Sequence, residues 1–165
     1  MDPASPKIYS LVESQPKAIV VHCSDPRFQR AFREFISDEL QLRDGDYIPL
    51  VISGGVGSLS EPLKLPKEFK FMKERIQLFL DRFESITRIV LINHEDCRHY
   101  EALKDLLGKL FLNRVAGMVE RQKLDLSSVA RSLIQLFDRK TALELYYAHF
   151  ADADRKLVRF DRIEV

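Results

Sequence analysis

Short apolar, β-branched runs alternate along the chain with longer segments that carry apolar residues at helical spacing. The runs at 17–23, 47–52 and 88–93 are rich in valine and isoleucine, so they predict buried strands of a parallel sheet. Between them, residues 28–40 and 67–83 repeat phenylalanine, isoleucine, leucine or methionine every three or four positions. This period predicts two amphipathic helices that cover the sheet.

The pattern is less uniform beyond the third predicted strand. Leucines at helical spacing between residues 100 and 110 predict a further helix, and residues 127–137 predict another. Residues 113–126 fit neither the helical nor the strand period, and Gly117 suggests a turn within them.

The chain closes with two β-rich runs, 142–150 and 156–165, joined by Asp-Ala-Asp-Arg, a pattern typical of a hairpin. The order of elements therefore predicts an α/β fold: a mainly parallel central sheet of about five strands, with helices on both faces and a C-terminal antiparallel edge hairpin. Residues 1–16 are predicted to form an N-terminal arm, and residues 17–165 a single domain.

Composition and charge exclude several classes of protein. The 165 residues are 45% hydrophobic and 31% charged, with 26 lysines and arginines against 25 acidic residues, which argues against a nucleic-acid or anionic-membrane partner. No apolar stretch approaches the roughly 20 residues that span a bilayer. The polar, proline-rich start argues against a signal peptide, so a cytoplasmic location is expected. There the two cysteines are expected as thiols or metal ligands rather than as a disulfide.

Two motifs follow the first and third predicted strands: His-Cys-Ser-Asp-Pro-Arg at 22–27 and His-Glu-Asp-Cys at 94–97. Because parallel strands end at one edge of an open sheet, Cys23, His94 and Cys97 are expected to converge there. Two thiolates and an imidazole are a ligand set that zinc favours, and catalytic zinc sites keep a fourth position for water. The sequence therefore predicts one Zn²⁺ per chain.

The fourth ligand has two candidates. Asp25 lies close enough to Cys23 to bind zinc directly and close the site. Alternatively, Arg27 holds the Asp25 carboxylate in a charge-assisted pair, and Asp25 accepts a hydrogen bond from a zinc-bound water. Only the second arrangement contains a nucleophile. Asp25-Pro26 also predicts a helix start, with Asp25 as the N-cap and Pro26 at the first helical position.

Together the two motifs resemble the signature of the β-class carbonic anhydrases, Cys-x-Asp-x-Arg after one strand and His-x-x-Cys after another. Gly45-Asp46 before a strand, the glycine-rich loop at 53–58 and the closing hairpin extend the resemblance over most of residues 17–165.

The resemblance implies reversible hydration of CO₂ to bicarbonate by a zinc-bound hydroxide, a lyase reaction. Cys23, His94 and Cys97 would be the zinc ligands, and Asp25 and Arg27 the catalytic dyad that orients the hydroxide and gates the metal. Members of the family build the site at a dimer interface, so a homodimer or a larger homo-oligomer is implied.

The chain departs from the family's pattern at two places. The family's loop reads Arg-Asn-Ala-Gly-Asn, whereas residues 52–56 read Ile-Ser-Gly-Gly-Val and keep only Gly55; the glycine that follows the second cysteine is replaced by Arg98. Gly54, Gly55 and Arg98 are therefore candidates for the substrate pocket, where Arg98 could alter access, attract an anion or point into solvent.

These departures leave two alternatives open. One is a related zinc hydrolase of another small heterocumulene, COS or CS₂. The other is a non-catalytic, zinc-stabilised or redox-responsive protein in which Asp25 closes the coordination sphere. Near the motifs, His22 alternates with Cys23 and is expected to face the opposite side of the sheet. Glu95 and Asp96 are expected to be turn residues rather than acids of the reaction.

Overall fold

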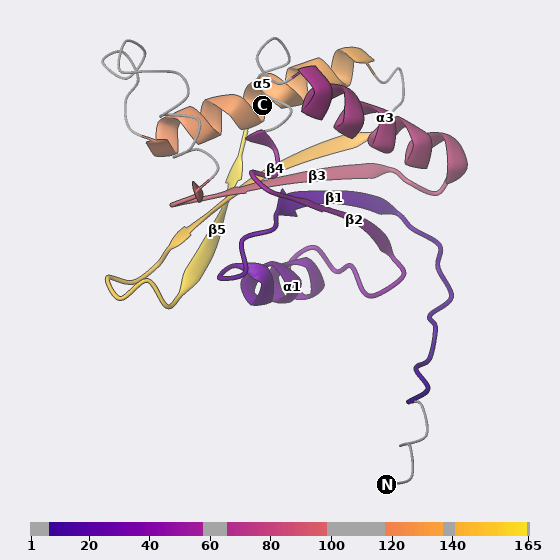
Figure 1. Ribbon diagram of the computed structural model, residues 1–165, viewed down its shortest axis with the longest axis horizontal. Helices are drawn as coiled ribbons and strands as arrows, with labels where there is room; N and C mark the ends of the chain where they lie inside the picture. The colour runs from indigo at the N-terminus through magenta and orange to yellow at the C-terminus, as the bar shows by residue number, and fades with distance from the viewer. Residues whose placement is uncertain (1–6, 58–65, 99–117, 137–140, 165) are drawn as a thin grey trace, which may run out of the picture.

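The computed structural model describes residues 7–57, 66–98, 118–136 and 141–164. In this part of the chain, five strands form one sheet that helices cover on both faces (Figure 1). The elements in chain order are β1 (Ala18–Cys23), α1 (Gln29–Asp38), β2 (Tyr47–Ile52), α3 (Pro66–Arg82), β3 (Arg88–His94), α5 (Met118–Leu136), β4 (Ala142–Phe150) and β5 (Val158–Ile163).

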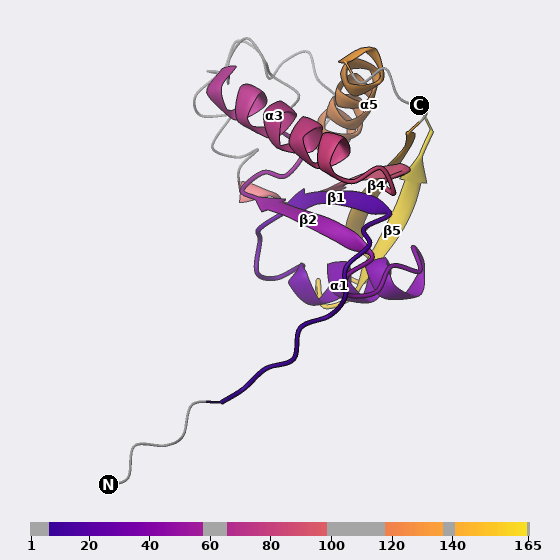
Figure 2. The ribbon, with the colours of Figure 1, turned by 90° about the vertical axis from the view of Figure 1, so that its right-hand side faces the viewer.

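The sheet has the strand order β2-β1-β3-β4-β5. Strand β1 pairs in parallel with both β2 and β3, β3 pairs in parallel with β4, and β4 and β5 form the antiparallel hairpin at the edge. Helix α1 lies on one face, whereas α3 and α5 lie on the other (Figure 2). The predicted α/β architecture is confirmed, including the edge hairpin.

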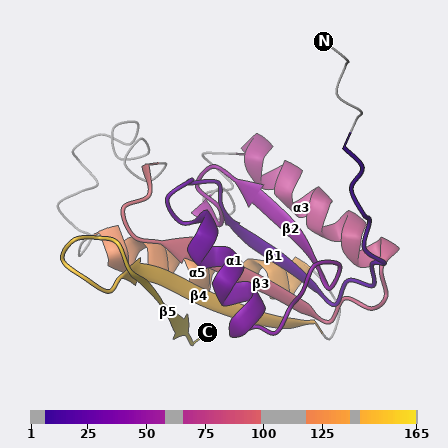
Figure 3. The ribbon, with the colours of Figure 1, turned by 90° about the horizontal axis from the view of Figure 1, so that it is seen from below.

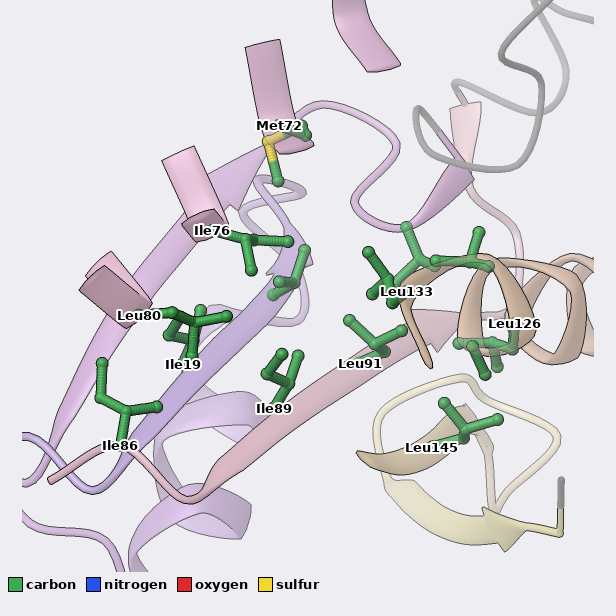
Figure 4. Packing of buried hydrophobic residues seen from close by; sticks show 14 of the residues in the cluster. Ile19, Met72, Ile76, Leu80, Ile86, Ile89, Leu91, Leu126, Leu133 and Leu145 are labelled. Carbon is green, nitrogen blue, oxygen red and sulfur yellow. The ribbon is translucent and has the colours of Figure 1, made fainter. Parts of the chain in front are cut away.

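Alternation along the central strands divides the apolar side chains between two cores. On the face covered by α3 and α5, Ile19 and Leu91 pack among residues from both helices (Figure 4). On the other face, Val20 and Ile92 pack against the phenylalanines of α1, which lies across the sheet in Figure 3. Because both faces of β1 and β3 are covered, their sequences read as continuous β-branched runs rather than as alternating ones.

Two helices begin at residues other than those predicted. Helix α1 begins at Gln29, with Phe28 as N-cap. Asp25 and Pro26 belong instead to the turn before the helix, where the Asp25 Oδ1 accepts the Arg27 backbone N–H at 3.0 Å and the Asp25 carbonyl accepts the Phe28 N–H at 3.2 Å. Helix α5 begins at Met118, well before residue 127. The face that it turns to the protein interior carries the buried polar residues Gln122 and Asp125, which interrupt the apolar period.

Of the two remaining predicted helices, one is confirmed and the other lies outside the described residues. Helix α3 confirms the prediction for 67–83 within one residue at either end. The helix predicted at 100–110, with the turn predicted near Gly117, lies outside the described residues. None of the described helices combines the length and apolar character needed to cross a membrane.

The segment before β1 runs away from the sheet layers (Figure 1). Its apolar residues Ile8, Tyr9 and Leu11 are 96%, 81% and 99% exposed. The segment touches the body at the turn before β2, where the Ser14 hydroxyl donates to the Gly45 carbonyl at 3.2 Å. A division into an arm of residues 1–16 and a domain of residues 17–165 stays a prediction.

Candidate metal centre

Three potential metal ligands meet where two neighbouring strands end. Cys23 is the last residue of β1 and His94 the last of β3, and Cys97 follows β3 after a short turn. All three side chains are buried, and one ligand atom from each lies within 4.8 Å of the other two. The Sγ atoms of Cys23 and Cys97 are 3.9 Å apart. The predicted convergence of these residues is confirmed.

The imidazole of His94 is oriented as a metal ligand requires. It packs against the Phe28 ring, with centroids 4.2 Å apart, and its Nδ1 lies 2.8 Å from the Glu95 carbonyl oxygen. A carbonyl can only accept, so Nδ1 carries the proton and Nε2 is left with a lone pair. That Nε2 is buried and has no hydrogen-bond partner among the described residues. A metal ion would satisfy it.

The surroundings of Cys23 favour its thiolate form. A hydrogen bond with the Cys97 thiol lowers the pKa of Cys23 to about 4 against the opposing effect of burial, and the neighbouring His94 and the Asp25 backbone N–H lower this pKa as well. Metals bind the thiolate rather than the thiol. Two thiols and an imidazole with a free Nε2 therefore fit a soft, tetrahedral ion such as Zn²⁺.

Asp25 is held by Arg27 on both of its oxygens. The Arg27 guanidinium donates from Nη2 to Oδ2 at 2.7 Å and from Nε to both oxygens at 3.1 and 3.2 Å, and the Arg27 backbone N–H donates to Oδ1 at 3.0 Å. These hydrogen bonds lower the pKa of the Asp25 carboxyl. The structure thus contains the Asp25–Arg27 pair that one of the two arrangements requires, and the identity of the fourth ligand stays a prediction.

Neither a protein-family model nor a curated protein sequence matches the chain. Solved structures do. A carbonic anhydrase from Glaciozyma antarctica matches with a TM-score of 0.54 and 14% identity, over 93% of this chain and 85% of that one. Tetrameric β-carbonic anhydrases from Sordaria macrospora match with a TM-score of 0.50 and 15% identity, over 92% and 82%. A β-carbonic anhydrase from Trichomonas vaginalis matches with a TM-score of 0.50 and 13% identity, over 96% and 88%.

The chain has the β-carbonic anhydrase fold. The identities are too low to carry an activity across, so the roles of individual residues depend on the geometry of this chain. Asp25 and Arg27 are paired beside the ligands, but their part in a reaction stays a prediction.

The glycine-rich loop, where this chain departs from the β-carbonic anhydrase pattern, lies directly against the first ligand. Gly55 has φ +50°, and a Cβ at this position would lie only 2.9 Å from the backbone nitrogen of Cys23. Gly54 beside it is also buried. Arg98, by contrast, is exposed. That these three residues line a substrate pocket stays a prediction.

The turn between His94 and Cys97 holds more contacts than the sequence suggests. The Glu95 backbone N–H donates to the Ala148 carbonyl at 2.8 Å and its carboxylate accepts the Phe150 N–H at 3.0 Å, so Glu95 ties the turn to β4. Asp96, predicted to be only a turn residue, accepts the second edge of the Arg27 guanidinium. No sequence pattern predicts the contact between Arg27 and Asp96, because the two residues lie far apart in the chain and share no period.

His22 lies, as predicted, on the face of the sheet opposite to the Cys23 side chain, where α1 packs. Its ring packs against Phe32 with centroids 4.7 Å apart, and its Nδ1 lies 3.0 Å from the Cys23 carbonyl oxygen. Burial lowers the pKa of His22. Its contacts make it part of the packing behind Cys23 rather than a fourth ligand.

Proposed function

We propose that this protein is a zinc-dependent carbonic anhydrase that interconverts CO₂ and bicarbonate. The observation that carries the proposal is the pairing of Asp25 with Arg27 beside three converging ligands. With Asp25 held in this way, a metal bound by Cys23, His94 and Cys97 keeps its fourth position for solvent. That is the arrangement typical of catalytic rather than structural zinc sites.

Each residue of the site has a role in this proposal. The thiolates of Cys23 and Cys97 and the Nε2 lone pair of His94 hold the metal. Bound there, Zn²⁺ would supply Lewis-acid activation of a water molecule, whose pKa such a centre lowers to roughly 7. Asp25 is an acceptor, able to take a hydrogen bond from the attacking oxygen and to orient its lone pair towards CO₂. Arg27 keeps Asp25 ionised and in place.

The proposal includes a homodimer or larger homo-oligomer. The exposed apolar residues Ile8, Tyr9 and Leu11 support it, because a second copy of the chain could cover them. One structural neighbour is itself described as tetrameric.

Stopped-flow CO₂ hydration tests the activity directly. We expect about one zinc per chain, a hydration rate well above that of buffer, and loss of this rate in Cys97→Ser. Folded, zinc-loaded protein with no rate above buffer would contradict the proposal. The same preparation should be given COS and CS₂, because faster turnover of either would assign the site to a related hydrolase instead.

A further inference from the structure

The guanidinium of Arg27 is engaged along two edges. One edge, Nε and Nη2, holds Asp25. The other meets Asp96: Nη1 donates to the Asp96 carboxylate at 2.8 Å, and Nη2 donates to the Asp96 backbone carbonyl, also at 2.8 Å. Arg27 thus connects the turn after β1 to the turn after β3, the two segments that supply the ligands.

Asp96 is in turn held by a residue of the β4–β5 turn. The Arg155 Nη1 lies 3.4 Å from the same Asp96 Oδ2 that accepts from Arg27, and the Arg155 guanidinium lies over the Phe150 ring at 5.3 Å. Asp25, Arg27, Asp96 and Arg155 therefore form a row of alternating charge. The row runs from the 9% exposed Asp25 side chain to the 62% exposed Arg155 side chain.

We propose that Asp96 and Arg155 are positioning residues of the site. Asp96 fixes the Arg27 guanidinium, and Arg155 fixes the Asp96 carboxylate, so that Asp25 stays bound to Arg27 instead of binding the metal. The inference deepens the proposed function and rests on the metal centre that it assumes. Neither residue touches the reacting atoms; both act through Arg27.

The reason lies in a competition for Asp25. Its carboxylate can bind either the guanidinium or the metal, and the balance depends on how well the guanidinium is kept in place. The Arg27 side chain is long and 42% exposed, so without a second anchor it would lose much of its fixed geometry to rotamer freedom. The two charge-assisted hydrogen bonds that Arg27 donates to Asp96 supply that anchor.

Cobalt substitution tests this without relying on catalysis. The visible absorption of Co²⁺ reports whether a carboxylate or a water fills the fourth position, because the bands depend on the ligand set. Asp25→Ala protein, which has no carboxylate to offer, supplies the reference spectrum of the open site. All spectra are recorded at one fixed pH.

We expect the ratio of open to carboxylate-bound metal to fall about tenfold in Asp96→Asn, because the substitution removes the charge from the acceptor of the Arg27 Nη1 hydrogen bond. It should fall about two- to fivefold in Arg155→Met, whose ion pair is more exposed. Arg155→Lys keeps the cation and should restore most of that loss. In Asp96→Asn combined with Asp25→Ala, the open spectrum should return.

Asp154→Asn is the matched control, because Asp154 lies in the same turn as Arg155, is 75% exposed and, among the residues that the structure describes, forms an ion pair only with Lys156. Its spectrum should equal that of the wild type. Cobalt-loaded Asp96→Asn and Arg155→Met with wild-type spectra would overturn the positioning role while leaving the proposed activity intact. A zinc-loaded wild type without hydration activity would overturn the activity alone, and a chain that binds neither zinc nor cobalt would overturn both.

Discussion

Replacing Gly55 by alanine should damage the metal centre through the backbone alone. The new Cβ would lie 2.9 Å from the Cys23 nitrogen and 3.1 Å from the His22 carbonyl carbon. Both are main-chain atoms of β1, which pairs on either side with β2 and β3. No flexible side chain can move aside, so either the loop or the end of β1 must shift.

The expected cost has two parts. A non-glycine residue in the left-handed region costs about 1–2 kcal/mol, and Gly55 has φ +50°. Forcing a methyl group into a packed position costs about 1–3 kcal/mol more. Together these give a loss of about 2–5 kcal/mol in the free energy of unfolding. If the end of β1 yields, the Cys23 Sγ moves with it and metal affinity falls as well.

Gly45→Ala separates the two effects. Gly45 has φ +91°, and its added Cβ would lie 2.7 Å from the Glu13 carbonyl oxygen, at the opposite end of β2 from the ligands. Urea unfolding of the metal-free proteins should show a loss in both variants. Competition with a zinc chelator should show weakened binding only in Gly55→Ala. Wild-type zinc affinity in a destabilised Gly55→Ala protein would refute the reasoning.

Three further predictions concern other parts of the molecule. The Arg88 guanidinium on β3 donates to the two carboxylate oxygens of Glu144 on β4 at 2.6 and 3.1 Å, and these bonds lower the pKa of Glu144 against the opposing effect of burial. Glu144→Gln should therefore lower the free energy of unfolding by about 1–2 kcal/mol above pH 5, where Glu144 is ionised in both the folded and the unfolded wild type. This cost should disappear in urea unfolding as the pH falls through the lowered folded-state pKa, and a pH-independent difference would contradict it. Removing the metal with a chelator should lower the melting temperature, because a metal that binds only the folded chain stabilises it; an unchanged melting temperature would count against the ligand set. Leu11→Asp should shift the protein to a smaller species in light scattering if the arm packs on a second copy, because burial of a leucine is worth about 1.5–3 kcal/mol; an unchanged mass would exclude that packing.

The strands and the edge hairpin were accessible from the sequence, because burial on both faces makes the central strands apolar throughout. The runs that became β1 and β3 had to be apolar throughout, and the rule that parallel strands end at one edge then placed Cys23 near His94. Helix α5 was misjudged for the converse reason. The first half of this helix buries Gln122 and Asp125. The sequence pattern was read by assuming that buried positions are apolar, so it could not identify these polar positions as buried.

The contacts of Arg27 were only half accessible. Its pairing with Asp25 is local and follows from a spacing of two residues. Its pairing with Asp96 depends on the backbone conformation of the turn after β3. In this turn Asp96 adopts a left-handed φ of +56°, which aspartate tolerates but which its presence in the sequence does not predict. Such a contact is decided by tertiary structure, so no period or motif records it.

Each ligand of the proposed centre is held by contacts that do not involve a metal. Gly55 packs on the backbone of Cys23, Phe28 packs on the ring of His94, and Glu95 ties the turn before Cys97 to β4. The ligands are therefore preorganised by the sheet and its two cores. In small zinc modules the free energy of metal binding is also the free energy of folding, so that the metal-free chain unfolds. Here the metal-free chain should stay folded, and most of the free energy of metal binding is then available to hold the ion rather than to build its site.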